Sequence, residues 1–121
     1  MPYDDYTAHR IREVLDRKKV GYREIKMMGG ICWMVDEKMC CGLLTNKEDD
    51  QPLLMARIGP EKTEEALIQP FVQAKSFNIR PMKGYVFVTA DGIDREDDLE
   101  AWIDKSLAYN PFAKSSKKRK K

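Results

Sequence analysis

The chain has 121 residues, 42% of them hydrophobic and 35% charged, which suits a single domain with a modest core. No apolar run is long enough to span a bilayer and no signal-peptide pattern opens the chain, so we expect a cytoplasmic protein. The odd number of cysteines, at positions 32, 40 and 41, argues against a disulfide framework.

The net charge of +2 is unevenly distributed along the chain. Residues 113–121 contain six cations and no acidic residue, so residues 1–112 hold 16 cations against 20 acids. We therefore predict an acidic folded domain over 1–112 and a disordered basic tail over 113–121. The tail either serves only solubility or binds nucleic-acid phosphates, through Lys117, Lys118, Arg119, Lys120 and Lys121.

The first predicted element is a helix over residues 6–19. Asp4 or Asp5 can cap it and Gly21 can end it. His9 lies opposite the apolar stripe and is expected to be exposed. The stripe that we expect to be buried consists of Ala8, Ile11, Val14 and Leu15.

A strand over residues 22–27 follows, with one polar face that is typical of a sheet edge. Gly29 and Gly30 then permit a turn or a bulge.

Two apolar strands come next, over residues 31–35 and 39–44, joined by the two-residue turn 36–37. Both of their faces are apolar, so we expect a central position in the sheet, covered by helices or by a second copy of the protein. In this register Cys32 lies opposite Cys41, whereas the adjacent Cys40 and Cys41 point to opposite faces. The thiols are either small buried hydrophobes or, for Cys32 and Cys41, a redox pair; a zinc site is disfavoured.

The second half contains a strand over 53–58, a helix over 60–68, an irregular stretch over 71–79, a strand over 85–89 and a final helix. The short helix is expected to bury Ala66 and Leu67. Asp94 is the expected cap of the final helix, whose stripe is Leu99, Trp102, Ile103 and Leu107. The predicted fold is α+β in two layers, in the order helix, antiparallel sheet, helix, strand, helix.

No motif for a catalytic residue, a metal ligand or a cofactor stands out. The acidic runs 48–50 and 96–98 fit a solvated loop and a helix start better than a metal site or an acid–base pair. Cys41 lacks a nearby base in the sequence. We therefore expect a protein that is not an enzyme.

Arg57, Arg80 and Lys83 are the candidate contacts for an anion or a partner, and a small-molecule or anion-binding site near Arg57 is an alternative function. Arg57 ends a strand just before the helix start at 59–60, where free N–H groups favour negative charge. The alternative is structural: Arg57 pairs with Glu61 or Glu64, Lys83 pairs with a loop acid, and 82–84 only shapes the entry into a strand.

Several motifs, in order, resemble the N-terminal domain of the TfoX/Sxy competence regulators. Order and spacing agree from about residue 10 to residue 109. The motifs are Met27-Met28-Gly29-Gly30, Trp33-x-Val35-x-x-x-Met39-x-Cys41-Gly42, Met55-x-Arg57-x-Gly59-Pro60, Arg80-Pro81-Met82-Lys83-Gly84-Tyr85-Val86 and Leu99-x-x-Trp102-Ile103. The resemblance implies a secretion-chaperone-like α+β fold and a regulatory, protein-binding function. Self-association is a further expectation, which rests on the two strands that are apolar on both faces.

The chain departs from the family pattern at three places. Met28 stands where the family usually has Phe, and Glu37 stands where it has Gly late in the hairpin turn. A Lys-rich tail stands where full-length regulators resemble two-domain proteins with a helical C-terminal half. Their role, enhancing transcription of competence genes together with the cyclic-AMP receptor protein, is implied for the two-domain form; stand-alone versions have no assigned activity.

Overall fold

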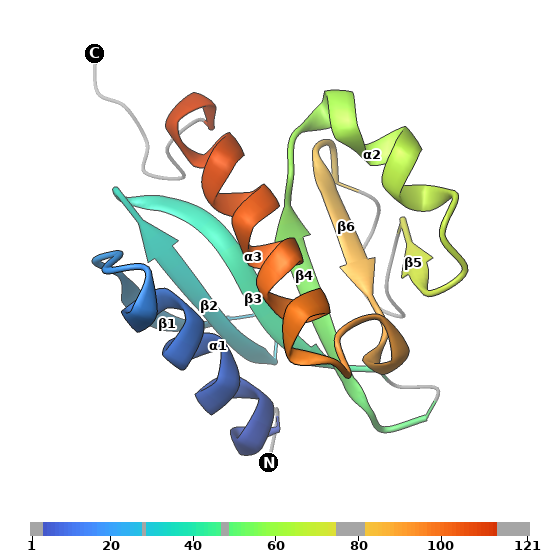
Figure 1. Ribbon diagram of the computed structural model, residues 1–121, viewed down its shortest axis with the longest axis horizontal. Helices are drawn as coiled ribbons and strands as arrows, with labels where there is room; N and C mark the ends of the chain where they lie inside the picture. The colour runs from blue at the N-terminus through green and yellow to red at the C-terminus, as the bar shows by residue number, and fades with distance from the viewer. Residues whose placement is uncertain (1–3, 28, 47–48, 75–81, 114–121) are drawn as a thin grey trace.

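The computed structural model (Figure 1) describes residues 4–27, 29–46, 49–74 and 82–113. In this part of the chain six strands form one antiparallel sheet, in the order β1-β2-β3-β4-β6-β5. The helices are α1 (Asp5–Arg17), α2 (Pro60–Leu67) and α3 (Glu96–Tyr109). The strands are β1 (Arg23–Met27), β2 (Gly30–Val35), β3 (Lys38–Thr45), β4 (Pro52–Arg57), β5 (Val72–Gln73) and β6 (Tyr85–Val88).

The three helices cover one face of the sheet, which makes the molecule a two-layer α+β fold as predicted (Figure 1). Buried side chains of all three helices join the first core cluster, together with strand residues such as Trp33 and Val86. A second cluster, on the other face, contains strand residues alone, including Cys32, Met55 and Phe87. No described helix has both the length and the apolar composition needed to cross a membrane.

Helix α1 begins as predicted and ends earlier than predicted. The carboxylate of Asp4 accepts a hydrogen bond from the backbone N–H of Thr7 at 3.0 Å, so Asp4 is the N-cap. The predicted stripe is fully buried. Lys19, with φ of 58°, and not Gly21, supplies the left-handed residue that closes the helix.

The β2–β3 hairpin contains the predicted two-residue turn. Asp36 and Glu37 have φ of 57° and 64°, the left-handed pair typical of a type I′ turn. Glycine is therefore not required at position 37, and the exposed Glu37 carboxylate pairs with Arg23 at 3.0 Å.

The predicted cysteine register is wrong because of a β-bulge. Trp33 pairs with Cys41 and Met34 with Met39, so Cys40 is an extra residue on β3. Cys32 consequently lies opposite Gly42, not Cys41. Cys40 and Cys41 share the helix-side cluster, whereas Cys32 belongs to the other cluster, which removes the basis for a Cys32–Cys41 redox pair.

Three smaller predictions also differ from the structure. The N-cap of α3 is Arg95 and not the expected Asp94. A 3₁₀ turn at Ala90–Gly92 precedes the helix, and the carbonyl oxygen of Asp94 accepts a hydrogen bond from the Arg10 side chain at 3.2 Å. Leu67 is 37% exposed, although Ala66 is buried as expected. The stretch expected to be irregular contains β5, which pairs with β6.

Candidate binding site at the β4–α2 junction

Two of the sequence motifs meet where β4 ends and β6 begins. The carbonyl oxygen of Gly84 accepts hydrogen bonds from the backbone N–H groups of Ile58 (2.9 Å) and Gly59 (3.0 Å). These bonds fix the backbone at the point where the chain turns from β4 into α2. Pro60 then starts the helix, where its missing N–H costs no intrahelical bond.

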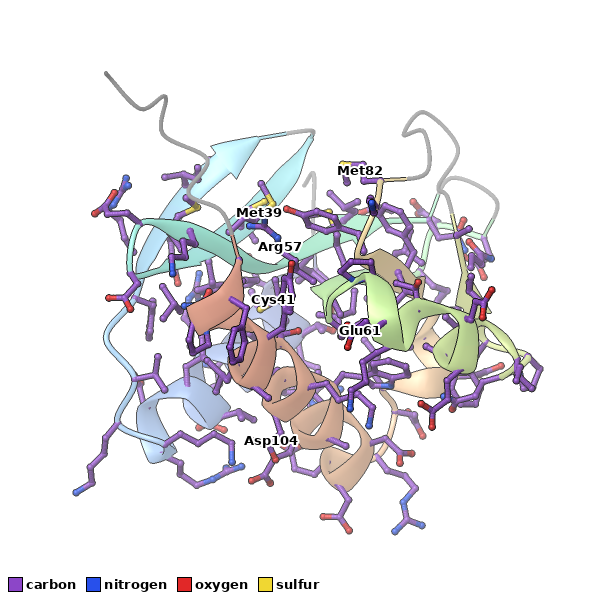
Figure 2. All side chains as sticks on the ribbon, turned by 90° about the horizontal axis from the view of Figure 1, so that it is seen from above. Met39, Cys41, Arg57, Glu61, Met82 and Asp104 are labelled. Carbon is purple, nitrogen blue, oxygen red and sulfur yellow. The ribbon has the colours of Figure 1, made fainter. Side chains whose placement is uncertain are left out.

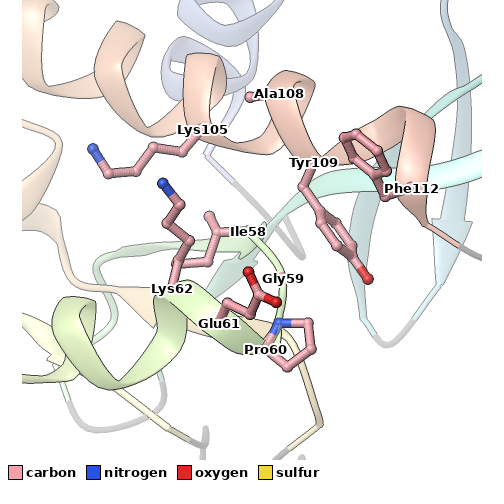
Figure 3. A pocket seen from close by; sticks show the side chains of 9 residues that line it. All are labelled: Ile58, Gly59, Pro60, Glu61, Lys62, Lys105, Ala108, Tyr109 and Phe112. Carbon is pink, nitrogen blue, oxygen red and sulfur yellow. The ribbon is translucent and has the colours of Figure 1, made fainter.

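Gly59 allows the end of α3 to approach this junction closely. Its φ is 96°, and a Cβ at this position would lie 2.6 Å from a ring carbon of Tyr109. Both the backbone conformation and the space therefore require glycine. The Tyr109 ring packs directly on the junction, so the start of α2 and the end of α3 lie side by side (Figure 3).

A groove of about 660 Å³ lies between these two helix ends. This volume falls within the range of ligand and partner pockets. Phe112 stands on its rim with 77% of its surface exposed. The groove is lined by Ile58, Gly59, Pro60, Glu61, Lys62, Lys105, Ala108, Tyr109 and Phe112 (Figure 3).

Two lysines give the groove a cationic side. Lys62 comes from α2 and Lys105 from α3, and their ammonium groups lie on the same side, away from the rings of Tyr109 and Phe112 (Figure 3). Lys105 Nζ also lies 5.5 Å from the centre of the Trp102 ring. Glu61 is the acidic residue among those lining the groove. The site can therefore hold an apolar group and a nearby anionic group at once.

Arg57 lies on the other face of the sheet. Its Nη1 donates a hydrogen bond to the carbonyl oxygen of Met39 at 3.3 Å, and its guanidinium lies 5.3 Å from the centre of the Tyr85 ring. Figure 2 shows Met39 and Met82 on the side of the sheet away from the helices. Burial raises the pKa of Tyr85, and the Arg57 charge partly opposes this rise.

The alternative pairing of Arg57 with an α2 glutamate is not found among the described residues. Among the described residues no carboxylate lies within ion-pair distance of Arg57, including Glu61 and Glu64. Lys83 is exposed and likewise forms no ion pair with a described acid. The other candidates lie outside the described residues: Arg80, Lys117, Lys118, Arg119, Lys120 and Lys121.

The chemically reactive side chains are poorly placed for catalysis. Burial raises the pKa of Cys32 to about 11, and a hydrogen bond with Cys40 together with burial raises the pKa of Cys41. Both thiols are thus protonated at neutral pH. His9 is exposed, and its Nε2 lies 3.1 Å from Oε2 of Glu13 on the same helix. Within the described ranges, no three His, Cys, Asp or Glu side chains are arranged to hold a metal ion.

Sequence reasoning missed the residues that line the groove apart from the 59–60 motif. Lys62 and Lys105 are 43 positions apart and look like ordinary solvated charges in their helices. One signal was available: Tyr109 and Phe112 flank Pro111, beyond the apolar stripe of the final helix. Aromatic residues outside a core stripe are candidates for a binding surface.

The sequence profile described as the TfoX N-terminal domain matches residues 17–109. The chain belongs to this family. This match confirms the resemblance seen in the motifs. The family is one of regulatory domains. Two of the motifs lie at the site: 55–60 contains Ile58, Gly59 and Pro60 of the groove, and 80–86 contains Gly84, whose carbonyl oxygen fixes the junction.

Comparison with other proteins adds support for the fold. No curated protein matches this TfoX N-terminal domain. A crystal structure of a protein from Pseudomonas syringae is similar, with a TM-score of 0.59 and 12% sequence identity. The similarity covers 82% of this chain and 93% of the other. At this identity the likeness concerns the fold alone.

Proposed function

We propose that this TfoX N-terminal domain regulates by binding a protein partner in the groove between α2 and α3, without catalysing a reaction. The single observation that carries the proposal is the groove itself: apolar walls, an exposed Phe112 and two lysines on one side. Exposed aromatic side chains beside a hollow are typical of interaction sites. We place this activity in the cytoplasm.

The state of the thiols supports binding over catalysis. A catalytic cysteine needs an accessible thiolate and a neighbouring base. Here Cys32 and Cys41 are fully buried, and the raised pKa of each keeps it protonated.

Site-specific photocrosslinking in the cell that makes the protein tests the proposal. A photoreactive residue at position 112 should yield discrete crosslinked species, because Phe112 is exposed at the rim of the groove. The matched control is position 97, exposed at the opposite end of α3. The cyclic-AMP receptor protein, the partner that the resemblance to the full-length competence regulators implies, is the first to examine among the crosslinked species. Equal crosslinking from both positions, or none from position 112, would contradict the proposal.

A second copy of the chain is one partner that this groove could hold. The apolar strand residues of the second face are already buried within one chain, with Met34 at 5% and Met39 at 9% exposure. A homodimer would therefore use the groove and not this part of the sheet. Light scattering at micromolar concentration tests it: a dimer that dissociates on Phe112→Ser supports a groove-mediated homodimer, and a monomer excludes one at that concentration.

A second candidate function is nucleic-acid association through residues 114–121, which contain six cations and no acid. The test compares the affinity for duplex DNA of the full-length protein and of a chain that ends at Ala113, over a series of salt concentrations. The shortened chain keeps Ala113 because this residue is buried. This candidate requires binding that weakens steeply with salt and disappears with the tail. Binding that survives the truncation would assign it to the folded part.

A third proposed contact is Arg57, for an anion on the second sheet face, with the exposed Lys83, near Tyr85 in the sequence, as a further candidate. The observation behind it is the stacking of Arg57 on Tyr85 with no described carboxylate beside it. Titration with inorganic phosphate, followed by NMR signals of the Arg57 side chain, tests this contact; signals that stay unchanged would remove it.

A further inference from the structure

We infer that the groove binds a short amphipathic helix of a partner protein, one that carries carboxylates beside its apolar face. This inference rests on the proposed function and specifies the chemistry of the partner. Three features support it: the apolar walls of the groove, the two lysines on one side, and the two helices, α2 and α3, that flank it.

The apolar half of the site calls for an aliphatic or aromatic anchor. Ile58, Pro60 and Tyr109 line the groove, and Phe112 stands on the rim with 77% of its surface in water. A small molecule held inside the groove would leave this ring largely exposed. A polypeptide that fills the groove and crosses the rim would cover the ring, which adds buried apolar area.

The charged half of the site selects against basic segments. Lys62 and Lys105 reach the same side of the groove from different helices (Figure 3). Neither forms an ion pair with a carboxylate among the described residues. A carboxylate on this side of the groove would be attracted to both ammonium groups, and Glu61 is the one acidic residue among the lining residues that would repel it.

The basic tail reinforces this selectivity. Ala113 follows Phe112 directly, and the next eight residues hold six cations. Residues 114–121, which follow Ala113 in the sequence, therefore carry the same sign as Lys62 and Lys105. An acidic segment is attracted over a distance by this charge before it reaches the groove, and a basic segment is repelled.

The walls favour a helix as the bound element. α2 and α3 flank the groove, and a helix laid between two helices presents its apolar side chains at intervals of three and four residues. Carboxylates at the edges of the apolar face would then lie near the lysines on one side.

A matched pair of synthetic peptides of about 14 residues tests the inference. Both share one apolar face of Leu and Phe and differ only in the flanking charges, Glu in one and Lys in the other. Fluorescence polarisation should show the Glu peptide binding the full-length protein at least about tenfold more tightly than the Lys peptide.

Variants locate the effect in the groove. The double variant Lys62→Glu with Lys105→Glu should remove or reverse the preference for the Glu peptide. Phe112→Ser should weaken both peptides alike and leave their ratio unchanged. The control, Lys19→Glu with Lys26→Glu, alters net charge equally at two exposed positions, one just after α1 and one on β1, and should change neither affinity by more than about twofold.

The outcomes separate this inference from the proposed function. Equal binding of both peptides would overturn the inference that the groove selects an acidic helix. So would a preference for the Glu peptide that the groove variant and its control alter equally. In either case a discrete crosslink from position 112 would still support the proposed protein binding. If neither peptide binds and sodium decanoate instead shifts the NMR signals of Tyr109 and Lys105, the groove takes a small amphipathic anion and the inference is wrong.

Discussion

Lys19 occupies a backbone conformation that favours glycine. Its N–H bonds to the carbonyl oxygen of Asp16 at 3.0 Å, and the N–H of Val20 bonds to that of Leu15 at 3.1 Å. Together with φ of 58° at Lys19, these bonds form a Schellman motif that closes α1. A side chain at this position carries steric cost that the motif itself does not require.

We expect Lys19→Gly to raise the free energy of unfolding by about 0.5–1 kcal/mol, because relief of the left-handed strain exceeds the added entropy of the unfolded chain. Urea denaturation measures the change. The matched control is Ala101→Gly, in the middle of α3 and exposed, which should lower stability by about 1 kcal/mol. Destabilisation by both substitutions would show that Lys19 is unstrained.

Glu24 joins the edge strand to α1 and to the core. Its carboxylate accepts hydrogen bonds from Arg12 of α1 and, at 2.9 Å, from the indole N–H of the buried Trp33. The bond from Arg12 lowers the pKa of Glu24 below its ordinary value of 4.5; the bond from Trp33 also lowers it, and partial burial opposes the change.

Because this pKa is lower in the folded state, the ionised Glu24 stabilises the fold above the unfolded pKa, and the contribution is lost as pH falls through the folded pKa. Glu24→Gln should therefore lower the free energy of unfolding by about 1 kcal/mol at pH 7. The difference should shrink toward zero as the pH drops below the folded pKa. Thermal denaturation from pH 7 down to about pH 3 measures it; a difference independent of pH would mean that the charge contributes nothing.

At the scale of elements, the contact between α2 and α3 depends on Gly59. Gly59→Ala would force a methyl group against the Tyr109 ring and impose a φ of 96° on alanine. We expect the free energy of unfolding to fall by about 2–4 kcal/mol, measured by urea denaturation. Gly21→Ala, which meets no atom within 4 Å, should stay within about 0.5 kcal/mol of the unaltered protein.

A double variant divides the cost at Gly59 into its two causes. Tyr109→Ala in the Gly59→Ala background removes the collision but leaves the backbone strain. The two substitutions should therefore cost less together than the sum of their separate effects. Strict additivity would indicate that the ring does not limit position 59.

At the scale of the whole molecule, the charge of the tail and the stability of the folded part are separate properties. Removing residues 114–121 leaves 16 cations against 20 acids, so the net charge changes from +2 to −4. We expect the free energy of unfolding to change by less than about 0.5 kcal/mol, because these eight residues are all Lys, Arg or Ser and offer no apolar side chain to bury. A larger loss in urea denaturation would show that the tail packs on the fold.

Local periodicity was sufficient for most elements. The 3.6-residue stripes of α1 and α3 and the alternating faces of β2 identified the buried residues, because the period of a side-chain pattern follows from backbone geometry alone. The motifs at 55–60 and 99–103 lie within the stretch that matches the family, so the family could be predicted from the sequence as well.

The extra residue Cys40 and the groove at the β4–α2 junction were decided by the tertiary structure. The bulge depends on how β3 pairs with β2, and the groove depends on Tyr109 reaching Gly59 across 50 positions of the chain. The amino-acid sequence by itself determined which segments form helices and strands, because this follows from interactions between near neighbours. Only the packing of α2 against α3 decided that Lys62, Lys105 and Phe112 share one site, because residues far apart in the chain meet only after the core has formed.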